Sequence, residues 1–102
     1  MNNFSEHKIF LKKKKGTFGF FLVTRKNKTG VYHFLENVIK DGPAWKAGLK
    51  QNDQVLEIKG KNVSNFSHYE AAEFIRKSGD NLFILVRRSK IIIEPIEVIR
   101  LF

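Results

Sequence analysis

The sequence predicts an α+β fold in one compact domain, with five to six β-strands and two helices. The chain has 102 residues, which suits a single domain and is too short for two. Short runs of aromatic and β-branched residues, separated by glycine, asparagine and lysine, favour strands. Two further segments carry the start and stop signals of helices. The expected order is strand, strand, strand, helix, strand, strand, helix, strand, followed by an apolar tail.

Three strands are expected before residue 40. Their segments either alternate polar with apolar side chains or are rich in phenylalanine, valine and isoleucine, and both patterns are typical of strands. The lysine run Lys12–Lys15 with Gly16 breaks the chain after the first strand, and a polar loop ending at Gly30 separates the other two. The first strand is expected at a sheet edge, and the second and third are expected to pair, at residues 7–12, 18–25 and 31–39.

Two helices and three shorter strands are expected in the rest of the chain. Pro43 suits the first turn of a short helix, and Gly48 suits its C-terminal cap. Ser67 is a suitable N-cap for the second helix, and Glu70 three residues later completes a capping box. This helix is expected to end near Gly79. The remaining strands are expected at residues 55–58, around residue 63 and at residues 82–86.

The domain is expected to span residues 1–89, with a basic hinge at 87–90 and an apolar tail at 90–102. Nineteen lysine and arginine residues against ten acidic ones give a net charge of +9, which favours acidic partners or an anionic surface. The absence of cysteine excludes disulfides, cysteine-ligated zinc and a thiol nucleophile. No apolar run approaches the roughly 18 residues of a membrane helix, and no signal peptide is recognised. The expected location is therefore cytoplasmic.

Catalysis, cofactors and metal ions are not expected. The three histidines, His7, His33 and His68, form neither an HExxH motif nor a close cluster with acidic residues. No G-x-S-x-G motif offers a serine nucleophile. The segment 16–19 leads into a strand and lacks the Gly-Lys-Ser/Thr of a phosphate loop. His7 and His33 are instead expected on strand surfaces, and Trp45 is expected to be partly exposed.

The basic composition leaves open a second interpretation, a module that binds anionic lipid headgroups or nucleic acid. Its footprint would be Lys12–Lys15 together with Lys26 and Lys28. Phenylalanines interleaved with lysines would suit stacking on bases. They fall in apolar runs, however, where a core position is favoured, and a lysine run is more typical of a solvated strand edge. Nucleic acid is therefore disfavoured, whereas an anionic membrane surface stays open as a partner.

Three motifs at matching spacing resemble the PDZ domain family. Thr17-Phe18-Gly19-Phe20 resembles the family's X-Φ-Gly-Φ carboxylate-binding loop, with a basic residue upstream. Residues 42–60 resemble its most specific stretch, a short helix ending at Ala-Gly-Leu, then a strand that follows an aspartate and closes on a glycine turn. Val63 and residues 68–75 resemble the region of the second helix. The resemblance covers about residues 8–88 and implies a PDZ-like, partly open antiparallel barrel or sandwich capped by two helices.

Among PDZ subfamilies the chain is most similar to the sodium–hydrogen exchanger regulatory factor type. The similarity rests on the Phe-Gly-Phe-Phe-Leu stretch and the late Arg-Lys-Ser-Gly. Two positions depart from the family pattern. Asn52 stands where glycine usually precedes the aspartate, but asparagine tolerates a positive φ better than most residues. Thr17 replaces the first loop glycine, which varies freely in the family, so neither departure alters the expected fold.

The resemblance implies a scaffolding module that binds the free C-terminus of a partner by strand addition. The amides of residues 18–20 would receive the terminal carboxylate, because consecutive N–H groups form an anion-binding nest. Gly19 would let the backbone approach closely, and Lys13 or Lys15 would add charge through water. The implied partners are C-termini of membrane or signalling proteins, which would extend the location to the inner face of the plasma membrane.

The second helix would form the other wall of the groove. His68, Ala72 and Ile75 lie at i, i+4 and i+7 and therefore share one helix face. His68 would pair with a hydroxyl two residues before the ligand's end, which gives the class I preference Ser/Thr-X-hydrophobic-COOH. The apolar residues of both walls would hold the last side chain, whereas Phe74 is expected in the core. The implied peptide-binding residues are Lys13, Lys15, Thr17, Phe18, Gly19, Phe20, Phe21, Leu22, Val23, His68, Ala72 and Ile75.

The tail at residues 90–102 lies outside the resemblance and is rich in isoleucine. Such an apolar segment is expected to be covered, and Pro95 argues against one long central strand. One alternative places Phe102 in the groove of a neighbouring molecule. The other, which is favoured, has the tail folding back on the domain or pairing with a second copy.

Overall fold

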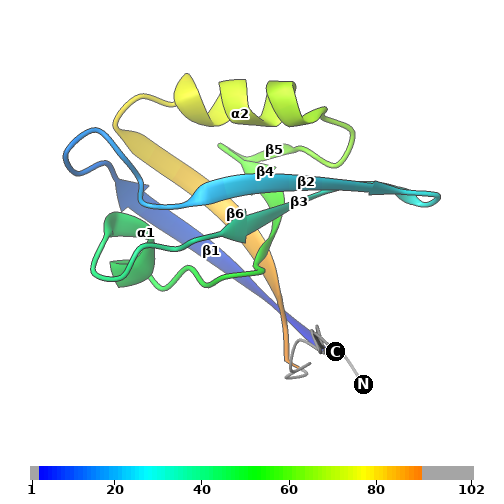
Figure 1. The fold of residues 1–102 in the computed structure, drawn as a ribbon, viewed down its shortest axis with the longest axis horizontal. Helices are drawn as coiled ribbons and strands as arrows, with labels where there is room; N and C mark the ends of the chain where they lie inside the picture. The colour runs from blue at the N-terminus through cyan, green and yellow to red at the C-terminus, as the bar shows by residue number, and fades with distance from the viewer. Residues whose placement is uncertain (1–2, 91–102) are drawn as a thin grey trace, which may run out of the picture.

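The computed structural model describes residues 3–90 and consists of one open antiparallel sheet and two helices (Figure 1). Across the sheet the strand order is β1-β6-β4-β3-β2, with β5 paired to β4. The predicted α+β fold is confirmed, whereas the expectations for residues 91–102 lie outside the described residues. In chain order the elements are β1 (Phe4–Lys12), β2 (Phe21–Asn27), β3 (Gly30–Glu36), α1 (Pro43–Lys46), β4 (Gln54–Ile58), β5 (Lys61–Asn62), α2 (His68–Arg76) and β6 (Asn81–Ser89).

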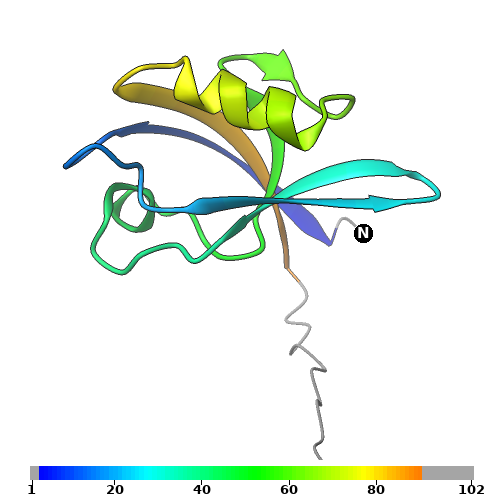
Figure 2. The same cartoon turned by 45° about the horizontal axis from the view of Figure 1, so that its top comes forward.

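The two outer strands of the sheet are β1 and β2. β1 pairs with β6 along its whole length, and β2 pairs with β3 from Phe21↔Glu36 to Asn27↔Gly30. Among residues 3–90, β3 is the only strand that pairs with β2. Helix α2 runs beside it, as Figures 1 and 2 both show. A free strand edge therefore lies next to a helix, which is where a further strand can pair.

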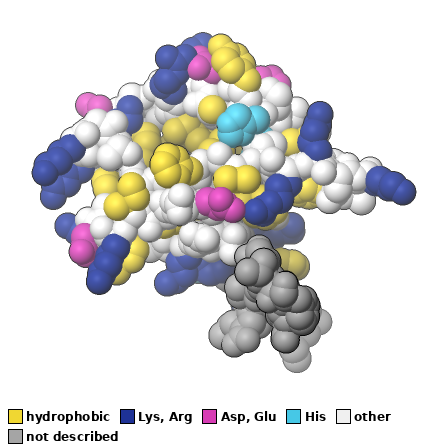
Figure 3. Space-filling view, viewed as in Figure 1, with side chains coloured by type: hydrophobic (Ala, Val, Ile, Leu, Met, Phe, Trp, Pro, Cys, Tyr) yellow, Lys and Arg dark blue, Asp and Glu magenta, His cyan; other side chains and the backbone are white. Residues whose placement is uncertain are grey.

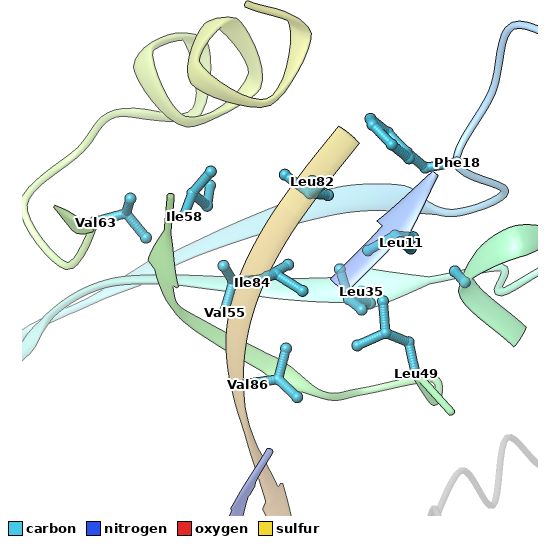
Figure 4. Packing of buried hydrophobic residues seen from close by; sticks show 11 residues of the cluster. Leu11, Phe18, Leu35, Leu49, Val55, Ile58, Val63, Leu82, Ile84 and Val86 are labelled. Carbon is cyan, nitrogen blue, oxygen red and sulfur yellow. The ribbon is translucent and has the colours of Figure 1, made fainter. Parts of the chain in front are cut away.

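The core lies inside the curved sheet and is closed by both helices. Along β6, Leu82, Ile84 and Val86 are at most 1% exposed, while Phe83 between them is 53% exposed. This alternation follows from the two-residue repeat of a strand. Ala71 anchors α2 to the interior. The buried apolar cluster, drawn in Figure 4, contains Leu11, Phe18, Leu35, Ala44, Leu49, Val55, Ile58, Val63, Leu82, Ile84 and Val86.

The predicted helix signals are confirmed. Ser67 Oγ accepts a hydrogen bond from Glu70 N at 3.1 Å, and Glu70 Oε1 accepts one from Ser67 N at 2.9 Å, so the capping box is complete. The bond from the Ser67 backbone lowers the pKa of Glu70. Gly48 follows α1 with a φ of 94°, as a C-terminal glycine does. Asn52 has a φ of 69° and thus fills the turn that usually holds glycine.

Several expected strand boundaries are wrong, and β1 already begins at Phe4 rather than at residue 7. β2 begins at Phe21 rather than at residue 18, because Gly19 has a φ of 82°, outside the range of a strand. β3 ends at Glu36 rather than at residue 39, because Asn37 has a φ of 47°. The short strand expected around Val63 is β5, Lys61–Asn62, and Val63 follows it in the core.

The basic hinge expected at residues 87–90 is wrong for residues 87–89, which belong to β6. β6 continues through Ser89 because its last three residues pair with the first three of β1, in the register Phe4↔Ser89, Ser5↔Arg88 and Glu6↔Arg87. The backbone pairing outweighs the local signal of consecutive charged residues, which on its own favours a loop.

A buried ion pair connects the loop after α1 with β6. Asp53 is fully buried, and its Oδ1 and Oδ2 accept hydrogen bonds of 2.8 Å from Nε and Nη2 of Arg88. Arg88 Nη2 also donates to the carbonyl of Gly48 at 2.8 Å, and Lys50 N donates to Asp53 Oδ2 at 2.9 Å. The pair therefore fixes the start of β4 against its neighbour in the sheet, β6.

Candidate binding groove between β2 and α2

Two adjoining pockets between β2 and α2 form one groove along the free edge of β2. They share Leu22. On this side of the molecule, Figure 3 shows a histidine and several hydrophobic side chains. The first pocket has a volume of about 230 Å³ and is lined by Lys13, Gly16, Thr17, Phe18, Phe20, Leu22, Ala72, Ile75 and Arg76. The second pocket has a volume of about 480 Å³ and is lined by Leu22, Val23, Thr24, Lys26, Val31, Ser67 and His68.

The loop before β2 closes one end of the groove. Lys14 and Thr17 exchange two backbone hydrogen bonds, of 3.0 and 3.2 Å, which form a turn. The carbonyls of Phe18 and Gly19 accept bonds of 2.9 Å from the amides of Ala44 and Ile39. These two carbonyls are thus used within the protein, and the loop is fixed to the segment around α1.

Glycine suits position 19 because its φ of 82° lies in the region that side chains disfavour. An added Cβ would make an ordinary van der Waals contact with Pro43 Cδ, at 3.4 Å. The close approach of a ligand that is expected at this position stays a prediction.

The side-chain hydroxyl of Thr17 is hydrogen-bonded to an amide that a ligand carboxylate was expected to bind. Gly19 N–H donates to Thr17 Oγ1 at 3.0 Å. A carboxylate that took this N–H would first displace the threonine hydroxyl. The loop of this chain therefore holds an internal acceptor at the expected anion site.

Most of the expected groove residues surround the first pocket. The rings of Phe18 and Phe20 stack at 6.4 Å, and Lys13 Nζ lies 5.3 Å from the centroid of Phe18. This contact keeps the ammonium group beside the apolar pocket. Lys15, Gly19 and Phe21 line neither pocket, and Phe21 is 60% exposed. Of the two lysines expected near the carboxylate, the structure therefore brings only Lys13 to the pocket wall.

Sequence reasoning missed Arg76. It lines the first pocket and forms an ion pair with Glu73, whose hydrogen bond raises the pKa of the guanidinium. The signal was present, since Arg76 follows Ala72 by four residues and therefore lies on the same helix face.

The second pocket contains the end of a hydrogen-bonded chain of three side chains. His68, at the start of α2, has its Nδ1 2.7 Å from Thr24 Oγ1. The same hydroxyl lies 2.8 Å from His33 Nδ1, and His33 Nε2 lies 3.1 Å from the carbonyl of Phe66. Sequence reasoning placed His68 correctly at this wall but missed Thr24.

The expected surface position of His33 is wrong. It is 1% exposed in β3, on the same face as the buried Leu35 two residues later. Its two ring nitrogens both have partners, which makes burial of the polar ring acceptable. His7 is half-buried in β1 beside Ser5 Oγ at 2.8 Å, and Trp45 is 47% exposed, as expected. Phe74 packs partly buried against the core.

Burial of His33 predicts a pH-dependent stability. Loss of solvation lowers the pKa of its imidazole below the ordinary 6.5, so the unfolded chain binds the proton more readily. The part of the free energy of unfolding that depends on a neutral His33 is fully present above about pH 6.5 and is lost as the pH falls. Urea unfolding at pH 7.5 and 5.5 is expected to show a larger decrease for the wild type than for His33→Gln. Equal decreases in the two proteins would contradict the prediction.

The lysines of the expected lipid or nucleic-acid footprint do not form one patch. Lys12, Lys14 and Lys15 are exposed around the β1–β2 loop, and Lys26 and Lys28 are exposed at the β2–β3 turn. The two groups lie at opposite ends of β2 (Figure 1). Seven strand residues separate them by roughly 20 Å. The structure thus does not favour this footprint as a single binding surface.

The described part of the chain contains neither a candidate membrane-spanning helix nor a candidate metal cluster. Neither α1 nor α2 has the length and apolarity that crossing a bilayer requires. Within residues 3–90, the histidine and acidic side chains do not gather in threes at a point where a metal ion would be held.

Comparison with known proteins identifies the family. A family model described as the PDZ domain matches residues 8–87. The chain belongs to the PDZ family. The PDZ domain from choanoflagellate SHANK1, solved bound to a GIRK3 peptide, is 30% identical with a TM-score of 0.75, and the match covers 83% of this chain and 93% of that one. The groove between β2 and α2 is therefore the candidate site of a PDZ domain with a peptide-bound structural relative.

Curated relatives give a similar picture at the level of sequence. Human SH3 and multiple ankyrin repeat domains protein 1 is 33% identical over 93 residues, and protein 2 of the same name from Xenopus laevis is 33% identical over 89 residues. The matches cover 79% and 76% of this chain but only 4% and 7% of those proteins. The expected similarity to the sodium–hydrogen exchanger regulatory factor type is not supported by these relatives. Two short stretches were too few residues to separate PDZ subfamilies.

Proposed function

We propose that this PDZ domain is a scaffolding module that binds the free C-terminus of partner proteins of class I, Ser/Thr-X-hydrophobic-COOH. The ligand would add as a strand to the free edge of β2 and lie against α2. Main-chain hydrogen bonds would provide much of the affinity, and alternate side-chain pockets would provide the specificity.

The observation that carries the proposal is the order of features along the groove. The loop of residues 17–20 closes one end, the apolar first pocket adjoins it, and His68 lines the second pocket. A terminal carboxylate, an apolar last side chain and a hydroxyl two residues earlier would meet these features in that order. Lys13 beside Phe18 adds a positive charge near the expected carboxylate.

The proposed peptide contacts fall into two groups. Lys13, Thr17, Phe18, Phe20, Leu22, Ala72 and Ile75 line the first pocket, while Val23 and His68 line the second. Gly19 would act through its backbone, Phe21 through the strand edge and Lys15 through solvent. The SHANK1 PDZ domain in complex with the GIRK3 peptide supports this mode of binding by its similarity to the chain.

The proposed partners are C-termini of membrane or signalling proteins. Such partners would hold the protein at the cytoplasmic face of the plasma membrane. For the tail at residues 90–102 we propose that it covers its own apolar side chains, by folding back on the domain or by pairing with a second copy. We infer no catalytic activity, since the proposed function needs only binding.

A panel of four peptides of one sequence tests the proposal. The peptides end in a free or an amidated carboxyl group and carry threonine or valine two residues before the end. We expect the free threonine peptide to bind best by isothermal titration calorimetry, with a Kd in the micromolar range, about −8 kcal/mol. Amidation should weaken binding at least tenfold, because it removes the charge that the loop amides would receive.

Two outcomes would contradict different parts of the proposal. Equal affinity for free and amidated peptides would contradict C-terminal recognition. Equal affinity for threonine and valine peptides would contradict the class I preference while leaving C-terminal recognition intact. Measurement at two salt concentrations provides a control, because simple charge attraction to the basic chain would decrease steeply with salt.

A further inference from the structure

The chain of side chains behind His68 has a direction that follows from its last acceptor. The Phe66 carbonyl lies 3.1 Å from His33 Nε2 and can only accept a hydrogen bond. His33 Nε2 therefore carries the proton. His33 is 1% exposed, and burial lowers its pKa, so that the ring is neutral at pH 7 and above. In a neutral imidazole the other nitrogen, Nδ1, is then an acceptor.

The same argument continues through the threonine to His68. Thr24 Oγ1 lies 2.8 Å from His33 Nδ1, and because that nitrogen accepts, the hydroxyl donates its single proton there. The hydroxyl is then left as an acceptor for His68 Nδ1 at 2.7 Å. His68 must therefore carry its proton on Nδ1. When His68 is neutral, its Nε2 has a free lone pair.

We propose that the chain Phe66 carbonyl–His33–Thr24 fixes His68 in the tautomer whose Nε2 accepts a hydrogen bond, and so selects ligands that offer a hydroxyl donor. This inference rests on the proposed function, because it explains how the second pocket would recognise Ser/Thr. A ligand carboxylate, which can only accept, would meet a lone pair and be rejected. Thr24 and His33 are positioning residues, and His68 is the group that contacts the ligand.

The geometry distinguishes this role from direct contact by Thr24. Both functions of the Thr24 hydroxyl, donor and acceptor, are used by the two imidazoles. Its single proton is used by His33, so Thr24 has none to donate to a peptide. Removing the hydroxyl while keeping the volume should therefore change the discrimination between ligands rather than the overall affinity.

The test compares Thr24→Val with Thr24→Ser. Valine matches the shape of threonine without its hydroxyl, and serine keeps the hydroxyl. We expect the ratio of affinities for free threonine and valine peptides to decrease at least threefold in Thr24→Val and to be retained in Thr24→Ser. His68→Ala gives the lower limit of this ratio, since it removes the contacting group.

An experiment without peptide tests the chain itself. Nitrogen-15 NMR of the imidazole rings at pH 8 is expected to show His33 protonated on Nε2 and His68 protonated on Nδ1. In Thr24→Val the His68 signals should move toward the opposite tautomer, and in Thr24→Ser they should not. Failure of all peptides to bind would overturn the proposed function and would leave these spectra unaffected.

Two results would overturn the inference. The first is a wild-type His68 with its proton on Nε2. The second is an unchanged threonine-to-valine ratio in Thr24→Val, whether the two affinities stay the same or fall equally through a general effect on the groove.

Discussion

Replacing Asp53 with asparagine is expected to lower the free energy of unfolding by about 3–5 kcal/mol, the usual cost of removing one partner of a buried ion pair. Arg88 would lose its charged partner and one of its two acceptor oxygens on residue 53, because the asparagine amide keeps one oxygen and presents an NH2 group in place of the other. The bonds to Asp53 raise the pKa of the guanidinium in the wild type. In the variant the group still stays charged, because arginine does not lose its proton in proteins. A small domain has a total stability of about 5–15 kcal/mol, and this loss would therefore be a large fraction of it.

Arg88→Met removes the other partner of the ion pair. It is expected to lower the free energy of unfolding by an amount at the upper end of the same range, about 5 kcal/mol. Asp53 is fully buried, whereas the Arg88 side chain is 23% exposed and can recover some hydration. With Arg88 removed, the buried carboxylate would keep only the amide of Lys50. Urea unfolding followed by circular dichroism measures both variants.

The exposed pair Arg25–Glu36 provides a matched control. Its Nη2–Oε1 distance is 3.1 Å, but the two side chains are 55% and 35% exposed. Pairs of this kind contribute about 0–1 kcal/mol, so Glu36→Gln should change the free energy of unfolding by less than 1 kcal/mol. If Asp53→Asn changed it no more than this control does, the buried pair would not have the stabilising role assigned to it.

The parts of the fold that were predictable are those with local causes. The capping box of Ser67 and Glu70, the Pro43 start of α1 and the asparagine turn at Asn52 each depend on a few neighbouring residues. Their geometry in the structure agrees with what those residues prefer. The face shared by His68, Ala72 and Ile75 was predictable for the same reason, because the helical repeat alone determines it.

The parts that were not predictable depend on residues distant in the sequence. β6 extends through Arg87 and Arg88 because β1 pairs with them, and no local pattern indicates that pairing. The burial of His33 depends on Thr24 and on the Phe66 carbonyl, which lie nine residues before it and 33 residues after it. A polar side chain acquires a buried role only when the fold brings its partners to it.

Filling the first pocket is expected to have a large effect on peptide affinity. Replacing Ala72 with phenylalanine is expected to abolish measurable binding of the free threonine peptide. Ala72 and Ile75 form the α2 side of this pocket, opposite Phe18, Phe20 and Leu22. A phenyl ring at position 72 would occupy the volume in which the last side chain of the ligand is proposed to lie.

The expected size of the effect follows from the burial that the ligand would lose. Burying a valine or leucine side chain contributes about 2 kcal/mol, and its loss weakens binding roughly 30-fold. From a Kd in the micromolar range, this places the variant near the limit of calorimetry. Ala72→Val should give an intermediate loss, because it fills only part of the pocket.

Tyr69→Ala is the matched control on the same helix. Tyr69 is 72% exposed and lines neither pocket, so this change should leave peptide affinity within about twofold. Ala72 is only partly buried and its side chain faces the open pocket, so Ala72→Phe should unfold at nearly the same urea concentration as the wild type. A folded Ala72→Phe variant that still bound the free threonine peptide with wild-type affinity would place the ligand's last side chain outside the first pocket. The carboxylate would then have to be received elsewhere than at the loop of residues 17–20, because a strand added to β2 with its end at that loop cannot avoid the pocket beside it.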